Sequence, residues 1–193
     1  MAINLQRISL PCGPGSLSEL VQSATHVLRI DRSGPAVLID VSGKKPVAYE
    51  LPILVIPSGN SNADSARVAI SGGFAPDGQQ LVLLRAGGTE DTASVELFDT
   101  QTREQRSSFE VVLTRRYAVS MMPDGERILV RGVPESLLCS REGKVLSRLA
   151  TPKSFALSPS GEQLCLEDQD NQFVVRPLAG KTGKVKFEAS SVT

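Results

Sequence analysis

The sequence repeats one five-residue pattern at Phe74-Ala-Pro-Asp-Gly78, Met121-Met-Pro-Asp-Gly125 and Leu157-Ser-Pro-Ser-Gly161. In each copy an apolar residue stands two positions before the proline. Another stands three positions after the glycine, namely Leu81, Ile128 and Leu164. A degenerate fourth copy occurs at Ile30-Asp-Arg-Ser-Gly34. The copies recur at intervals of about 40 residues, a period typical of repeats that each form one supersecondary unit.

The pattern has the chemistry of a tight turn between two strands. Proline presets φ at the first central position, Asp or Ser bonds the backbone two residues on, and glycine accepts a positive φ. We therefore assign structural turn roles to Pro76, Asp77, Gly78, Pro123, Asp124, Gly125, Pro159, Gly161 and, in the degenerate copy, Gly34. Each repeat is then expected to run strand, turn, strand, turn, strand and a looser fourth strand.

The rest of the chain favours an all-β class. Alternating or short apolar runs are closed by Gly, Pro, Asp, Asn or Ser at intervals of about ten residues. The expected strand cores are Val37–Val41, Leu51–Ile56, Leu81–Leu84, Val95–Phe98, Ile128–Val130 and Phe173–Val175. One short helix is expected at Ser16–Ala24, where Ser16 and Glu19 have capping-box spacing. Ser58–Ser65 is expected to be an exposed loop.

These repeats resemble those of the WD-repeat and TolB-like β-propeller superfamily, whose blades commonly carry an S-P-D-G-x-x-L turn between their first two strands. Val95-Glu-Leu-Phe-Asp99 matches the place where a third strand of such a blade often ends. The chain departs from the family pattern in having no tryptophan and no Gly-His pair. The resemblance implies an all-β propeller or partial propeller of about four four-stranded blades, with the short N-terminal helix before it.

The expected organisation is a single domain over residues 1–193. It comprises an N-terminal strand and short helix at 1–24, a degenerate blade one at 25–58, blade two at 66–112, blade three at 117–149 and blade four at 153–188.

The charge composition of the chain limits the classes of partner that we expect. Lysine and arginine number 21 and so do aspartate and glutamate, which removes the general attraction for nucleic acid or an anionic membrane. Neither is expected as a partner. No apolar run reaches the length of a membrane span and residues 1–10 lack a signal-peptide core, so we expect a cytoplasmic protein, with a cleaved exported form left open.

Catalytic and metal-binding constellations are sparse. The three cysteines, Cys12, Cys139 and Cys165, form no C-x-x-C pair, so neither a disulfide framework, a zinc site nor any other cofactor is expected. A hydrolytic site would need His26, the single histidine, which we interpret instead as a residue that caps or lines a strand. The acidic stretch Glu167–Asn171 lacks the glycine and distal glutamate of a calcium loop and is expected to be a hairpin turn.

Two groups of residues are candidates for partner binding. Arg115, Arg116 and Tyr117 precede or enter the first strand of blade three, and Arg and Tyr combine large contact area with polar tips. The family resemblance implies that the loop entering this strand lies on the face most often used for binding. Glu90 and Asp91, in a loop of blade two, are the second group. A solvated loop is the alternative interpretation of both.

The sequence therefore predicts that the protein is not an enzyme but a non-catalytic interaction module, a subunit or scaffold of a larger assembly. The alternative is a small-ligand-binding or enzymatic propeller with its site at the central channel. Since four blades are few for this family, the predicted partner is another protein, or a second copy that pairs through the open blade edges. A closed four-bladed ring remains the competing arrangement.

Overall fold

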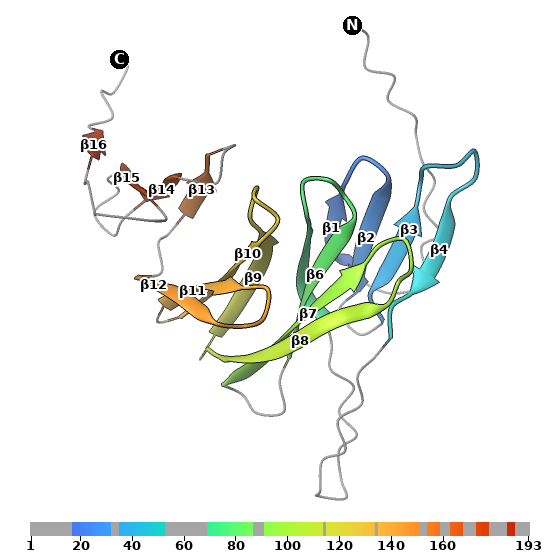
Figure 1. Cartoon of the computed structure of the whole chain (residues 1–193), viewed down its shortest axis with the longest axis horizontal. Coiled ribbons are helices and arrows are strands. Elements are labelled where there is room, and N and C mark those ends of the chain that lie inside the picture. Colours follow the sequence, from blue (N-terminus) through green and yellow to red (C-terminus); the bar gives the residue numbers. More distant parts are fainter. Residues whose placement is uncertain are drawn as a thin grey trace, which may run out of the picture.

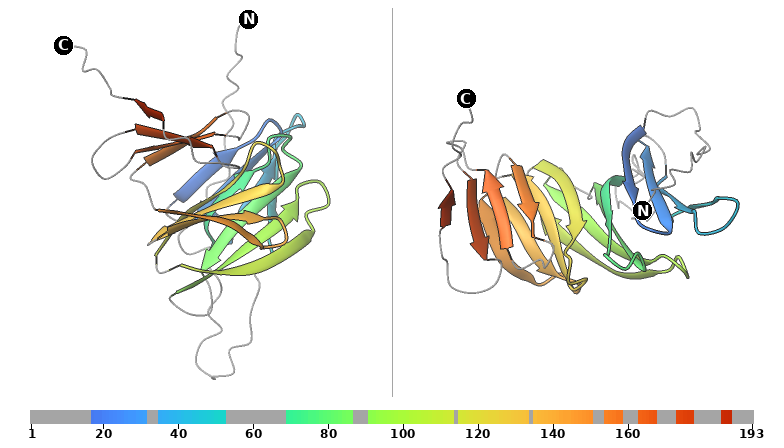
Figure 2. Two further views of the ribbon diagram at one scale, coloured as in Figure 1. Left: turned by 60° about the vertical axis from the view of Figure 1, so that its left-hand side comes forward. Right: turned by 90° about the horizontal axis from the view of Figure 1, so that it is seen from above.

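The structure is a computed structural model that describes residues 17–31, 35–52, 69–86, 91–113, 115–133, 135–150, 154–158, 163–167, 173–177 and 185–187. Every regular element in these residues is a β-strand, and the strands form four antiparallel sheets of four strands each. Within each sheet the strands follow chain order. The predicted all-β class with four-stranded units is confirmed, and Figure 2 shows the sheets in a row, from blue to red.

Sheet one contains β1 (Leu17–Gln22), β2 (His26–Asp31), β3 (Val37–Asp40) and β4 (Val47–Glu50). Sheet two contains β5 (Ala69–Phe74), β6 (Gln80–Ala86), β7 (Thr92–Asp99) and β8 (Gln105–Val112). Sheet three contains β9 (Arg115–Met121), β10 (Arg127–Val133), β11 (Glu135–Ser140) and β12 (Val145–Ala150). Sheet four contains β13 (Ser154–Leu157), β14 (Gln163–Glu167), β15 (Phe173–Pro177) and β16 (Val185–Phe187) (Figure 1).

The predicted helix at Ser16–Ala24 is wrong, because Leu17–Gln22 forms strand β1. Val21 pairs with Leu28 of β2 and packs against the buried cluster that contains Leu28. An isolated helix of this length is marginal in water, so the backbone pairing and burial offered by β2 outweigh local helix propensity. Sheet one therefore begins before residue 25, where blade one was expected to start.

The degenerate fourth copy of the turn pattern also lies elsewhere than expected. Ile30 and Asp31 are the last residues of β2, the second strand of its sheet, whereas Phe74 and Met121 end the first strands of theirs. The first connection is instead closed by Ser23, whose Oγ accepts a hydrogen bond from the His26 N–H at 3.0 Å. Its backbone N–H donates to the His26 carbonyl at 2.8 Å. A serine-centred turn thus replaces Pro-Asp-Gly in sheet one.

Sheet two is buried on both faces. Val82 and Leu84 of β6 belong to an apolar cluster shared with sheet three, and Leu81 and Leu83 belong to a cluster shared with sheet one. The alternation of a strand sends successive side chains to opposite faces, so consecutive residues of a strand between two neighbouring sheets are both buried. This explains why Leu81–Leu84 of β6 appears in the sequence as a continuous apolar run.

A buried ion pair between β6 and β7 of sheet two is also hydrogen-bonded to the end of sheet one. Arg85 Nε lies 2.7 Å from Glu96 Oε2, and the two side chains are 1% and 0% exposed. Arg85 Nη2 also donates to the Pro52 carbonyl, which follows sheet one, at 2.9 Å. A charge left alone in such a place is strongly destabilising. The Arg85 side chain therefore needs both of these partners, and its bond to Pro52 holds the end of sheet one against sheet two.

The first strands of the sheets, β1, β5 and β9, lie close together along one side of the row. A Cβ built on Gly73 of β5 would lie 3.4 Å from the Ser120 Cα of β9, and Ser71 Oγ accepts a hydrogen bond from the Val119 N–H at 3.3 Å. The backbones of β5 and β9 therefore lie near each other on this side of the row, which we call the inner side.

The Pro-Asp-Gly turns have the geometry that glycine permits. Gly78 has a φ of 71° and Gly125 a φ of 70°, both in the left-handed region. The Gly78 N–H donates to the Ala75 carbonyl, and the Gly125 N–H donates to the Met122 carbonyl, each at 2.9 Å. Each turn reverses the chain between the first two strands of its sheet.

Gly72 offers a direct test of the inner packing. A Cβ at Gly72 would lie 2.3 Å from Leu28 Cδ2 and 3.0 Å from Leu83 Cδ2. We expect Gly72→Ala to lower the free energy of unfolding by roughly 1–3 kcal/mol through overpacking, measured by urea denaturation. Gly43→Ala is the control, since its Cβ would meet only the Lys45 carbonyl at 3.7 Å. Equal denaturation midpoints for the two variants would contradict this packing.

Candidate partner-binding surface

Because the strands in each sheet are antiparallel, the connections between them lie on two opposite faces of the molecule, one at each end of the strands. The end that carries the Pro-Asp-Gly turns and the β7–β8 turn is called the turn face. The other end, called the loop face, carries the β6–β7 and β8–β9 connections. Thr92 pairs with Val112, and Arg115 pairs with Val133, so the start of β7, the end of β8 and the start of β9 all meet at the loop face.

The predicted partner-binding residues that the structure describes lie on the loop face. Asp91 is an exposed turn residue whose carbonyl accepts a hydrogen bond from the Leu113 N–H at 2.8 Å. Arg115, Arg116 and Tyr117 form the first residues of β9; their side chains lie outside the description. The topology thus brings both predicted groups to one end of the molecule.

Several residues named in the sequence analysis lie outside the described part of the chain. They are Cys12, Gly34, Ser58–Ser65, Glu90, Pro159, Gly161, Asp168, Asp170 and Asn171. Of the acidic stretch, only Glu167 is described, at the end of β14.

A groove that sequence reasoning missed lies between sheets two and three, on their outer side. It has a volume of about 480 Å³ and is formed by the end of β8 together with β11 and β12. Its lining is Glu110, Val111, Val112, Leu113, Glu135, Leu137, Val145 and Arg148. We call it the lateral groove.

Packing closes the gap between sheets two and three towards the turn face. A Cβ at Gly143 would come within 2.6 Å of the Phe109 ring, and Gly143 has a φ of 87°. Ser107 Oγ donates to the Arg141 carbonyl at 3.3 Å. Towards the loop face, where Leu113 and Glu135 line the groove, the gap remains open.

The lateral groove combines an apolar floor with a charged rim. Leu113 and Leu137 are buried, whereas Val112 is 72% exposed and Val145 is 39% exposed. The large exposed apolar side chains of the described residues are Leu20, Val47, Val112, Val145 and Leu146, and the last three belong to β8 and β12. Clustered exposed apolar area of this kind marks contact sites more often than scattered residues do.

The chemistry of the rim is set by Glu110, Glu135 and Arg148. Arg148 forms an ion pair with Glu135 across β11 and β12. The sequence signal for this groove was two short apolar runs, Val111-Val112-Leu113 and Val145-Leu146. Because side chains alternate between the two faces of a strand, one of two consecutive apolar residues on an outermost strand has no buried position. Periodicity alone could not show that the two runs meet.

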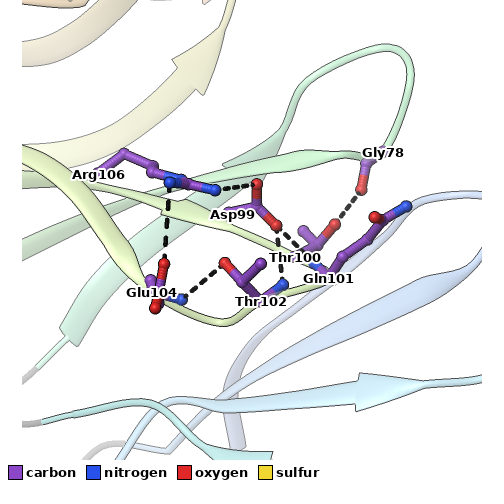
Figure 3. A network of polar contacts seen from close by, with 7 residues as sticks. All are labelled: Gly78, Asp99, Thr100, Gln101, Thr102, Glu104 and Arg106. Carbon is purple, nitrogen blue, oxygen red and sulfur yellow. Dashed lines mark hydrogen bonds and ion pairs between the residues drawn. The ribbon is translucent and has the colours of Figure 1, made fainter.

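A polar network on the turn face has a structural role (Figure 3). Asp99 Oδ1 accepts hydrogen bonds from the Gln101 and Thr102 N–H groups, each at 2.9 Å. Its Oδ2 accepts from Arg106 Nη2 at 2.9 Å, while Thr100 Oγ1 donates to the Gly78 carbonyl at 2.8 Å. The Thr102 N–H, followed by Arg106, holds the pKa of Asp99 below its usual value of 3.8.

This network predicts a pH-dependent stability. A carboxyl group whose pKa is lowered by folding stabilises the protein above its unfolded pKa and loses that contribution as the pH falls through the folded value. We expect Asp99→Asn to lower the free energy of unfolding by about 1 kcal/mol at neutral pH. The difference from the unmodified protein should shrink below about pH 4, measured by thermal melts across pH. A difference that persists unchanged at low pH would contradict the ionised role.

The hydrolytic alternative finds no assembled site around His26 in the described residues. His26 Nδ1 lies 2.9 Å from Thr25 Oγ1, and its ring centroid lies 6.5 Å from that of Phe74. Cys139 belongs to the buried cluster between sheets two and three, and burial raises the pKa of its thiol to about 11. A thiol with so high a pKa is a poor nucleophile at neutral pH.

The inner side of the row carries a second groove of about 460 Å³, at the place expected for a small-ligand site. Its lining comes from β1, β5 and β9 with the adjoining turns and consists of small, apolar and uncharged residues such as Gly73, Ser120 and Gln22. Among the described residues, no group of three His, Cys, Asp or Glu side chains could hold a metal ion.

The comparisons with solved structures agree with this arrangement. The β-propeller domain of Cps50 (Swd1) from Myceliophteria thermophila matches 87% of this chain with a TM-score of 0.63 and 14% identity. The Dos1 propeller matches 91% of it with a TM-score of 0.58 and 13% identity. The chain has a β-propeller fold. The predicted resemblance to propeller repeats is thereby confirmed at the level of the fold.

The chain spans 57% of the Cps50 domain and 60% of the Dos1 propeller. No family model matches the sequence, and no curated protein matches it. At these identities the likeness shows the fold of the propeller and carries no site residue across. None of the described segments is a helix long and apolar enough to cross a membrane.

Proposed function

We propose that the protein is a non-catalytic interaction module that binds another protein, as a subunit or scaffold of a larger assembly in the cytoplasm. The lateral groove carries this proposal, because two exposed apolar residues, Val112 and Val145, line it together with charged residues. Such a combination is typical of a protein contact, in which a few apolar anchors are surrounded by a polar rim. The proposed contact extends over the loop face to the first residues of the neighbouring strand β9, which are Arg115, Arg116 and Tyr117.

Affinity capture from the native host tests the proposal. We expect the tagged chain to enrich at least one protein, and the paired variant Arg115→Ala with Arg116→Ala to reduce that enrichment about tenfold, as loss of binding anchors does. The paired variant Lys44→Ala with Lys45→Ala is the matched control, since it removes two exposed cations at the turn face. Failure of the unmodified chain to enrich any protein would contradict the proposed function.

Self-association through the terminal sheets is a further part of the proposal. Val27, Val37 and Ile39 form an apolar cluster of sheet one that is separate from the cluster shared with sheet two. Leu20 pairs with Arg29, which pairs with Val37, so Leu20 belongs to the same face of sheet one, and it is substantially exposed. A two-fold pairing of sheet one with sheet four of a second copy would cover this face.

Light scattering measures this pairing. We expect the chain at tens of micromolar to have twice its own mass and Leu20→Lys to return it to the mass of one chain, because a buried ammonium group opposes association. Val47→Lys serves as the control, since Val47 is exposed to a similar degree at 47% against 49% for Leu20. A stable single chain at that concentration would rule out obligate self-pairing.

A further inference from the structure

The turn between β7 and β8 contains a residue with a strained backbone. Arg103 has a φ of 63°, and among the described residues it is the one residue other than glycine with a positive φ. An L-residue with a side chain reaches this left-handed conformation only at a cost in free energy, so surrounding contacts must hold it there. Glycine takes the same conformation without that cost. An arginine at this position therefore needs a compensating contact.

The side chain of Arg103 makes such a contact with sheet one. Its Cζ lies 3.9 Å from the centroid of the Tyr49 ring, within the range of a favourable cation–π interaction. Tyr49 belongs to β4 and pairs with Leu38 of β3, which packs in the apolar cluster shared with sheet two. Directly opposite residues of paired strands lie on the same face of a sheet. The Tyr49 ring therefore lies on the face of sheet one that is turned towards sheet two.

Arg103 meets sheet one through this ring and not through an ion pair. Within the described part of the chain, no carboxylate lies within ion-pair distance of its guanidinium. The carboxylate of Asp40, on β3, accepts hydrogen bonds from the Ser42 N–H at 2.8 Å and the Ser42 Oγ at 2.6 Å. These bonds, with a smaller contribution from the charge of Arg103, hold the pKa of Asp40 below its usual value of 3.8.

The backbone of the same turn is fastened to sheet two. The Arg103 N–H donates to the Asp99 carbonyl at 2.8 Å, and Asp99 Oδ1 accepts from the Gln101 and Thr102 N–H groups (Figure 3). The turn is thus anchored in sheet two by its backbone and in sheet one by one side chain. Any movement of sheet one relative to sheet two at this place acts on the strained residue.

The two gaps beside sheet two are closed differently near the turn face. Between sheets two and three, the Phe109 ring packs directly over Gly143. Between sheets one and two, the exposed Arg103 lies over the half-buried Tyr49. A cation over a ring at an exposed site is a weak contact, so the second closure can break without loss of the core.

We propose that Arg103 and Tyr49 form a clasp between sheets one and two that holds the β7–β8 turn in its strained form. When Tyr49 moves away from sheet two, the guanidinium loses the ring, and the turn relaxes towards a negative φ at Arg103. The shape of this part of the turn face therefore depends on the position of sheet one. The inference goes beyond the proposed function and does not depend on it.

Amide hydrogen exchange of the full chain, followed by NMR, tests the clasp. We expect Tyr49→Leu to accelerate exchange of the Arg103 and Thr102 N–H groups about two- to fivefold, the size expected for a cation–π contact at an exposed site. Val47→Ala is the matched control, because Val47 is an exposed residue of the same strand, and it should leave these rates unchanged. The Gly125 N–H, in the turn of sheet three, should keep its rate in both variants.

A double-mutant cycle separates the strain from the contact. Arg103→Gly relieves the strained φ but removes the cation. In a Tyr49→Leu background there is no clasp to lose, so Arg103→Gly should raise the folding equilibrium constant, measured by urea denaturation. With Tyr49 present the gain should be about two- to fivefold smaller or reversed. Tyr49→Phe keeps the ring and should give the same result as Tyr49.

Three results would overturn the inference. The first is an equal effect of Arg103→Gly in the two backgrounds. The second is an unchanged exchange rate of Arg103 and Thr102 in Tyr49→Leu. The third is an acceleration of Gly125 by the same factor, since the substitution would then destabilise the whole protein. If circular dichroism shows that Tyr49→Leu does not fold, Arg103→Lys decides by exchange at Gln101, because lysine keeps the charge but has no flat face to stack on the ring.

Discussion

The structure depends on one packing constraint: a four-stranded sheet with two apolar faces is stable only between two neighbours. Sheet two meets this constraint directly, with Leu81 and Leu83 against sheet one and Val82 and Leu84 against sheet three. The two larger apolar clusters of the described residues are each shared by two sheets, so the stability of each sheet depends on the next, as in other repeat architectures. The buried Arg85 pairs with Glu96 of its own sheet and also donates to the Pro52 carbonyl at the end of sheet one, so the neighbouring sheet completes the surroundings of this charge.

The same constraint produces the lateral groove. At the inner side the backbones of β5 and β9 come so close that Gly73 has only ordinary contact distance for a Cβ. Sheets that nearly touch at their first strands and fan outward must separate at their fourth strands. Near the turn face, Phe109 and Gly143 fill that separation. Towards the loop face, the space between the described residues of β8, β11 and β12 remains as the groove.

Local chemistry made the fold predictable from the sequence, because a tight turn is specified by the residues that form it. Pro76, Asp77 and Gly78 imply a reversal whatever surrounds them, and the period of the repeat implies stacked units. The first sheet escaped this reasoning, since Ser23 closes its turn and β1 is a strand only because β2 lies beside it. The helical spacing of apolar residues in Ser16–Ala24 covers few residues, and strand pairing with β2 outweighed it.

The groove could not be predicted, for a different reason. It requires residues of β8 and β12, which are far apart in the sequence, to line one gap whose width depends on the packing of whole sheets. The polar turn residues drew attention because they are conspicuous in the sequence, yet Asp99 satisfies its oxygens within its own turn. A side chain whose oxygens already accept hydrogen bonds from its neighbours has few acceptor positions available for a partner protein. Exposed apolar residues that line a groove remain available for such a contact, and for that reason the outer rim of sheets two and three is the stronger site.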